Sequence, residues 1–187
     1  MSELSQKILG ESHRIVIKIG SRILVDSARG GVRAPYIQKL AASVSKLMDA
    51  GKEVVIVSSG AVGTGMAILG YAEKPSVMAE KQACAAVGQI DLMYVYREMF
   101  RAKNVCVGQI LLSADDFRDR GRYKNLQNTM RAMLSKKIVP IINENDPLAV
   151  SEIKVGDNDT LSSDVALFLD ADLLLIVSDE DGLFDDN

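Results

Sequence analysis

Five short apolar runs, most of them rich in β-branched residues, are spread along the chain and constrain its fold more than any other feature. Between consecutive runs, apolar residues recur at three- and four-residue intervals, which is the period of an amphipathic helix. A strand, a helix and a second strand in this order favour a right-handed parallel crossover. We therefore predict an α/β fold, a three-layer αβα sandwich whose central, mostly parallel sheet is covered by helices on both faces. The predicted strands, the last of them buried, are residues 14–19, 53–57, 105–112, 138–142 and 173–177.

The segments between these strands divide into helices and loops. Ser113, followed by two acids at 115 and 116, has the pattern of a helix N-cap. Gly88 lies among small residues in the longest helical segment, which favours a packing role over a ligand-binding one. The predicted helices cover about residues 35–51, 75–103 and 126–137, with a fourth that starts at 158 or 159. We predict loops at 58–65 and 118–125, a turn or hairpin at 26–34, and a small hairpin over residues 148–154 that covers the site.

The composition is that of an ordinary globular protein. The 187 residues are sufficient for one domain, and 48% of them are hydrophobic and 25% charged. The net charge of −3 and the lack of a basic run argue against nucleic-acid binding, and the apolar runs are too short to span a membrane. The N-terminal segment lacks the apolar core of a signal peptide, so we expect a cytoplasmic protein. Cys84 and Cys106 have neither disulfide nor metal-ligand spacing, and we predict two buried thiols and no protein metal site.

Two clusters of acids and amides occur within a short interval of the chain. Residues 143–147 follow the strand at 138–142, and residues 156–159 precede the helix that begins at 158 or 159. Asn, Asp, Gly and Pro commonly form turns, and a single such tetrapeptide would favour that interpretation. Two clusters beside buried elements, one of them at a helix N-terminus where amides can bind anions, instead favour a ligand site.

Lys18 is flanked by isoleucines inside the first predicted strand and is followed by Gly20 and Ser21. Two interpretations stay open: an edge strand whose lysine points to solvent, or a buried ammonium that meets an anionic ligand. A glycine after the strand would let backbone amides approach a phosphate closely. The chain contains neither the dinucleotide-binding fingerprint G-x-G-x-x-G nor the P-loop pattern G-x-x-x-x-G-K-[ST].

Five segments, taken in order, resemble the amino acid kinase family and, within it, the glutamate 5-kinases. They are KIGS at 18–21, SSGAVG at 58–63, NENDPLAV at 143–150, KVGDND at 154–159 and SDEDGLF at 178–184. The resemblance implies the amino acid kinase fold and transfer of the terminal phosphoryl group of ATP to the side-chain carboxylate of L-glutamate, with Mg²⁺ as cofactor. The product would be L-glutamyl 5-phosphate, the first intermediate of proline biosynthesis. It further implies feedback inhibition by proline and a homo-oligomer.

The resemblance also assigns roles to individual residues. It implies that Lys18 stabilises the transferring phosphoryl group and that Asp159 and Asp157 hold this lysine or organise the phosphates. The attacking carboxylate is ionised at neutral pH, with a reference pKa of about 4.3, so the reaction needs no general base. The implied substrate-binding residues are Ser59, Gly60, Asn143, Asp146 and Asn158, and the implied nucleotide-binding residues are Lys18, Gly20, Ser21, Ser178 and Asp179.

The match to the family has two departures. Phe184 replaces the usual tyrosine of the last segment. The family's kinase domain also continues past the equivalent of residue 187, with a glycine-rich segment and a second phosphate-contacting lysine, so we expect the N-terminal, substrate-binding part of one kinase domain, without most of the nucleotide-binding part. The alternatives are a non-catalytic sensor of glutamate or proline, and a kinase for another small carboxylate or a nucleotide monophosphate.

Overall fold

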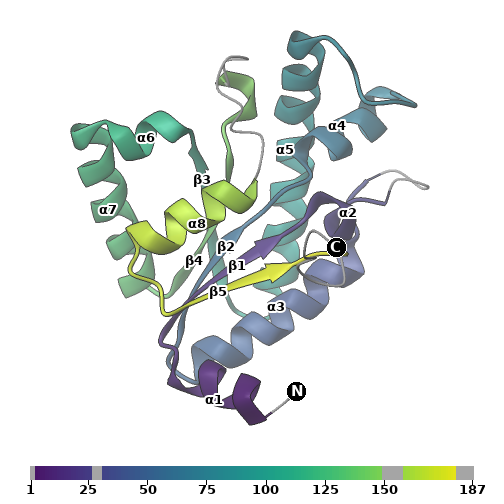
Figure 1. Cartoon of the computed structure of the whole chain (residues 1–187). Helices are drawn as coiled ribbons and strands as arrows, with labels where there is room; N and C mark the ends of the chain where they lie inside the picture. Colours follow the sequence, from purple (N-terminus) through teal and green to yellow (C-terminus); the bar gives the residue numbers. More distant parts are fainter. Residues whose placement is uncertain (1–2, 27–30, 149–157, 180–187) are drawn as a thin grey trace, which may run out of the picture.

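The computed structural model describes residues 3–26, 31–148 and 158–179, which form a five-stranded sheet between layers of helices (Figure 1). Every ladder between named strands is parallel, and the order across the sheet is β3-β4-β2-β1-β5. The predicted α/β architecture is confirmed. The strands are β1 (Arg14–Ile19), β2 (Glu53–Val57), β3 (Cys106–Leu112), β4 (Ile138–Glu144) and β5 (Leu173–Val177).

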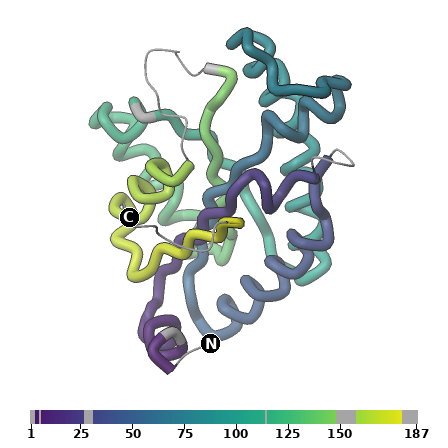
Figure 2. The backbone as a smooth tube through the Cα atoms, turned by 45° about the vertical axis from the view of Figure 1, so that its right-hand side comes forward, coloured from purple at the N-terminus to yellow at the C-terminus, as the bar shows by residue number. Residues whose placement is uncertain are grey.

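Helices cover both faces of the sheet, and Figure 2 shows α7 and α8 on the opposite side from α3. One face packs against α3 (Ala34–Asp49) and α5 (Met78–Arg101), and α4 (Ala61–Leu69) lies against α5. The other face packs against α7 (Arg120–Ser135) and α8 (Asn158–Phe168). The short elements are α1 (Glu3–Glu11), α2 (Ser21–Leu24), α6 (Ala114–Arg118) and the 3-10 helix η1 (Asp146–Leu148). None of the helices in the described part of the chain is both long and apolar enough to cross a membrane.

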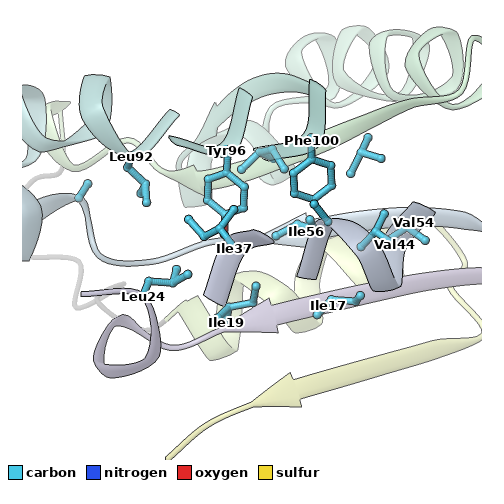
Figure 3. Packing of buried hydrophobic residues seen from close by; sticks show 14 of the residues in the cluster. Ile17, Ile19, Leu24, Ile37, Val44, Val54, Ile56, Leu92, Tyr96 and Phe100 are labelled. Atoms are coloured by element: carbon cyan, nitrogen blue, oxygen red, sulfur yellow. The ribbon is translucent and has the colours of Figure 1, made fainter. Parts of the chain in front are cut away.

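The alternation of side chains along β1 determines where Lys18 points. Ile17 and Ile19 belong to the core under α3 and α5, where Tyr96 and Phe100 face Ile37 and Ile56 (Figure 3). Val16 belongs to the opposite core, under α7 and α8. Because successive side chains of a strand point to opposite faces, Lys18 shares the face of Val16. Since β1 lies between β2 and β5, and only 7% of Lys18 is exposed, the interpretation of a solvent-facing edge lysine is wrong.

The predicted packing role of Gly88 is confirmed. A Cβ atom at this position would lie 2.0 Å from the carbonyl oxygen of Ala61, so α5 can approach the first turn of α4 this closely only with glycine there. The first turn of α4 directly follows the polar end of β2. This contact therefore fixes α5 against the part of the chain that carries Ser59.

The prediction of two loops is wrong for most of their residues, because 61–65 of the first are helical and so is every residue of the second except Asp119. Residues 58–65 contain the start of α4 at Ala61, and 118–125 contain the start of α7 at Arg120. Neither segment has apolar periodicity, because small residues fill the first and charged residues the second. Local capping nevertheless starts α7, since the Asp119 carboxylate accepts a hydrogen bond of 2.8 Å from the backbone N–H of Arg122. The predicted cap at Ser113 is confirmed, with Asp116 completing a capping box.

The two edges of the sheet are more exposed than the sequence predicted. Cys84 is buried as predicted, but Cys106 is exposed because it begins the edge strand β3. Strand β5 forms the opposite edge, and 37% of Leu175 and 55% of Ile176 are exposed, so the prediction of a buried last strand is wrong for these positions. The predicted hairpin at 148–154 lies, except for its first residue, outside the described residues.

Candidate active site

Residues from three parallel strands meet at the carboxyl ends of those strands. Lys18 of β1 is in register with Val57 of β2, and Val57 is in register with Ile142 of β4. This register brings two polar residues together: Ser59, which follows β2, and Asn143, near the end of β4. Open α/β sheets bind ligands at the carboxyl ends of their strands, which is where these residues lie.

Lys18 forms an ion pair with the first turn of α8. Its Nζ atom lies 2.5 Å from Oδ1 of Asp159, and the two side chains are 9% and 45% exposed. A buried ammonium requires an anionic partner, and the helix N-terminus favours the negative charge of Asp159. The lysine is thus held near the carboxyl end of β1 by a carboxylate that is partly exposed to solvent. A further anion at this position could share the same ammonium.

Four polar side chains from four different parts of the fold form what we call the amide cluster: Ser59, Gln89, Asn143 and Asn158. Asn158 Nδ2 donates to Ser59 Oγ at 2.8 Å and makes a longer contact of 3.4 Å with Asn143 Oδ1. Asn143 Nδ2 donates to Gln89 Oε1 at 2.8 Å. These bonds join β4, α5 and the end of β2 to α8, so each side chain is oriented before any ligand arrives.

A cavity of about 280 Å³ opens beside the amide cluster, and two acids line it. Burial, reinforced by the charge of Asp146, raises the pKa of Glu144 to about 7. Burial also raises the pKa of Asp146, and the nearby Lys74 opposes this effect. A positive charge near these acids would favour their ionised forms and offset the cost of burial. The cavity therefore suits a small ligand that carries a positive charge. Its lining residues are Ala61, Ala85, Ala86, Gln89, Ile90, Gln109, Leu111, Glu144, Asp146 and Pro147.

Gly60 turns the chain from β2 into α4. Its backbone has φ 98° and ψ 2°, a left-handed conformation that side chains disfavour, and a Cβ atom there would lie 2.9 Å from a methyl carbon of Val25. The glycine is required by this turn, which positions Ser59. Direct contact between Gly60 and a substrate stays a prediction.

The predicted nucleotide-binding residues lie where β1 and β5 end. The Gly20 amide donates to the carbonyl oxygen of Val177 at 3.1 Å, so this N–H is already used by the sheet. Ser21 begins α2, and the next residue, Arg22, places Nη1 3.2 Å from Oδ2 of Asp179. A hydrogen bond from its own backbone amide, followed by the bond from Arg22, holds the pKa of Asp179 below its usual value. Ser178 precedes it and is exposed.

The structure brings together Lys18, Ser59, Asn143, Asn158 and Asp159, and places Asp146 at the adjoining cavity. Asp157 lies outside the described residues. Sequence analysis did not single out Gln89, and it included Glu144 only as a member of the polar cluster at 143–147, without a role. Gln89 follows a run of small residues in a long helix. It lies 54 positions from Asn143 in the sequence and belongs to the site only because tertiary packing brings the two side chains together.

A sequence profile of the amino acid kinase family matches residues 13–187, nearly the whole chain. The chain belongs to the amino acid kinase family. The predicted family membership is confirmed, and the parallel sheet between helical layers agrees with the fold expected for it.

Relatives within this family are themselves named glutamate 5-kinases. Glutamate 5-kinase of Laribacter hongkongensis is 45% identical over 179 residues, which cover 96% of this chain and 48% of the relative. Glutamate 5-kinase 2 of Bacillus subtilis is 48% identical over 93% of this chain and 47% of its own length. Glutamate 5-kinase of a Marinomonas species is 44% identical over 99% of this chain and 49% of its own. The chain spans about half the length of the curated relatives it matches.

Proposed function

We propose that the chain carries the amino-acid-binding part of a glutamate 5-kinase, which transfers the γ-phosphoryl group of ATP to the side-chain carboxylate of L-glutamate. The main support is the arrangement at the carboxyl ends of the central strands. A buried lysine and a set of oriented amides lie there beside an acid-lined cavity. Identities of 44% to 48% with relatives named glutamate 5-kinase support this choice of acceptor.

The chemistry requires charge stabilisation and positioning more than proton transfer. A carboxylate oxygen of glutamate forms a bond to the γ-phosphorus while the bond from that phosphorus to the bridging oxygen of ADP breaks, and ADP leaves with the electron pair. The carboxylate is already ionised at neutral pH, so no proton has to be removed. The obstacle is the approach of two anions, and a fixed ammonium such as that of Lys18 lowers this barrier.

Each site residue has a physical role in this proposal. Lys18 stabilises negative charge on the transferring phosphoryl group, and Asp159 is a positioning residue that holds its ammonium; Asp157 would assist it. Asp146 pairs with the substrate ammonium from the cavity wall. Ser59, Asn143 and Asn158 orient the substrate through the amide cluster, and Gly60 allows the turn that positions Ser59.

The residues at the ends of β1 and β5 fit a polyphosphate that approaches Lys18. Ser21, Ser178 and Asp179 would contact the nucleotide there, together with Gly20. The described residues hold no group of three acids or other side chains suited to bind a metal ion, so Mg²⁺ would be held mainly by phosphate oxygens and water, as this ion often is. When bound, it would neutralise part of the phosphate charge.

The proposal extends to regulation and cellular context. Proline shares an α-amine and an α-carboxylate with glutamate, so it could compete for the same cavity as a feedback inhibitor. A biosynthetic kinase that uses free glutamate and ATP would act in the cytoplasm, and we propose that it does so as a homo-oligomer.

Calorimetry and product trapping test the proposal. The 187-residue chain is titrated with L-glutamate, D-glutamate, L-aspartate and L-proline, and the full-length protein is assayed with Mg-ATP and hydroxylamine, which traps the acyl phosphate. Selective binding of L-glutamate and formation of its hydroxamate are expected. Binding of glutamate without nucleotide binding by the full-length protein would favour a sensor, and phosphorylation of another acceptor alone would overturn the substrate.

A further inference from the structure

The orientation of the amide cluster is fixed at one end by the backbone. The N–H of Glu144 donates to Oδ1 of Asn143 at 2.9 Å. A backbone N–H can only donate, so the side-chain atom of Asn143 that accepts this bond must be the oxygen. The other terminal atom of the Asn143 amide is therefore the nitrogen. Asn143 Nδ2 then donates to Gln89 at 2.8 Å, and the atom of Gln89 that accepts must be its oxygen. One backbone donor thereby sets the direction of two side-chain amides.

This chain of bonds leaves a donor without a partner. Gln89 Nε2 is buried and makes no hydrogen bond with any atom of the described residues. A buried polar group in this state costs free energy, on the order of 1–3 kcal/mol, unless a ligand satisfies it. Rotating the amide would not help, because its nitrogen would then face the nitrogen of Asn143.

Gln89 lines the cavity that also contains Glu144 and Asp146. These two acids suit the ammonium of an amino acid, but they would repel its carboxylates, so a carboxylate in the cavity needs a donor from another side. We propose that Gln89 is a specificity-determining residue, which donates a hydrogen bond from Nε2 to a carboxylate oxygen of the bound amino acid. The identity of that amino acid rests on the proposed function, whereas the role of Gln89 requires only a carboxylate.

The chain offers a matched pair of variants. Q89E keeps an oxygen that can accept from Asn143 but replaces the free donor with a second oxygen. Q38E places the same charge on an exposed glutamine of α3, which does not line the cavity. We expect Q89E to bind L-glutamate about 10- to 100-fold more weakly than the wild type at pH 8.5, and Q38E to change affinity by less than about threefold.

Ligand amides provide the second measurement. The wild type should prefer glutamate over the analogue whose recognised carboxylate is replaced by an amide, and Q89E should reduce or reverse this preference, because the amide can donate to the new oxygen. Testing the α-amide and the side-chain amide in turn identifies which carboxylate Gln89 contacts. A ratio that is unchanged in Q89E overturns the proposal even if Q89E is less stable, since the ratio compares ligands on one protein.

The failure of this proposal and that of the proposed function give different results. If the wild type binds glutamate and Q89E loses no more affinity than Q38E, the role of Gln89 is overturned and the proposed function is unaffected. If the wild type binds a different dicarboxylate and Q89E loses that ligand, the substrate is wrong and the role of Gln89 stands. A wild type that binds none of the carboxylates overturns both.

Discussion

The amide cluster and the Lys18–Asp159 pair both lie at the carboxyl ends of the central strands, but they are held by different forces. The amide cluster is neutral and is oriented by hydrogen bonds that depend on geometry. The pair is ionic, with its lysine buried and its aspartate half exposed. Neutral hydrogen bonds give directional selectivity at small net energy, whereas a buried ammonium contributes most when a second anion arrives. The difference assigns ligand recognition to the first region and stabilisation of the transition state to the second.

Replacing Lys18 should have the largest effect. In a protein that carries the whole kinase domain, Lys18→Met should lower turnover by roughly 10²- to 10³-fold, the range found when one electrostatic donor is removed from an active site. The KM for glutamate should change much less, because the amide cluster is unaltered. Steady-state kinetics measure both values.

Lys39→Met is the control for this experiment, because it removes an exposed lysine from α3. It should leave both constants near those of the wild type. Equal losses of affinity and turnover in Lys18→Met would contradict the division between the two regions.

Asn158→Ala should have the opposite effect, on binding more than on turnover. The change removes the donor to Ser59 and the long contact to Asn143. Glutamate affinity should fall about tenfold, and the free energy of unfolding should decrease by about 1–2 kcal/mol. Calorimetry and urea denaturation are the measurements, with Thr160→Ala, an exposed change in the same helical turn, as the control. Unchanged affinity would remove Asn158 from the recognition site.

How far the sequence could predict this site depends on the kind of contact. The five strands, Lys18 and the polar ends of β2, β4 and α8 followed from local pattern and from the resemblance of short segments to a family. Gln89 could not be found in this way, since its partner lies on β4 and nothing in its local sequence distinguishes it. The exposure of Cys106 and Ile176 was missed for a similar reason: the edge strand β5 is as apolar as the central strands, and only the strand order shows that β3 and β5 lie at the edges.

The pH dependence of stability should reveal the acids next to the amide cluster. The pKa of Glu144 is about 7 in the folded protein against an ordinary value of 4.5. The folded protein therefore binds more protons than the unfolded chain between these values, so stability should fall as the pH rises through this window. The raised pKa of Asp146 acts in the same direction. The slope from Glu144 alone is below about 1.4 kcal/mol per pH unit, the limit for one proton.

Glu144→Gln should reduce this slope, and urea denaturation at a series of pH values would measure it. A bound ammonium favours the ionised acid, so wild-type affinity for glutamate should increase as the pH rises toward and past 7, and less so in the variant. A slope that is identical in both proteins would show that Glu144 is not the group that titrates.

The smallest effect should come from the ion pair of Arg22 and Asp179. Both side chains are exposed, and exposed pairs contribute little because water and salt screen them. Asp179→Asn should shift the unfolding midpoint by less than about 2 °C, measured by thermal denaturation. Its affinity for glutamate should equal that of the wild type, since Asp179 lies at the end of β5 and the amide cluster does not include it. If Asp179→Asn weakened glutamate binding as much as Asn158→Ala does, charge at the nucleotide side would contribute to acceptor recognition, and the two regions would have to be treated as one.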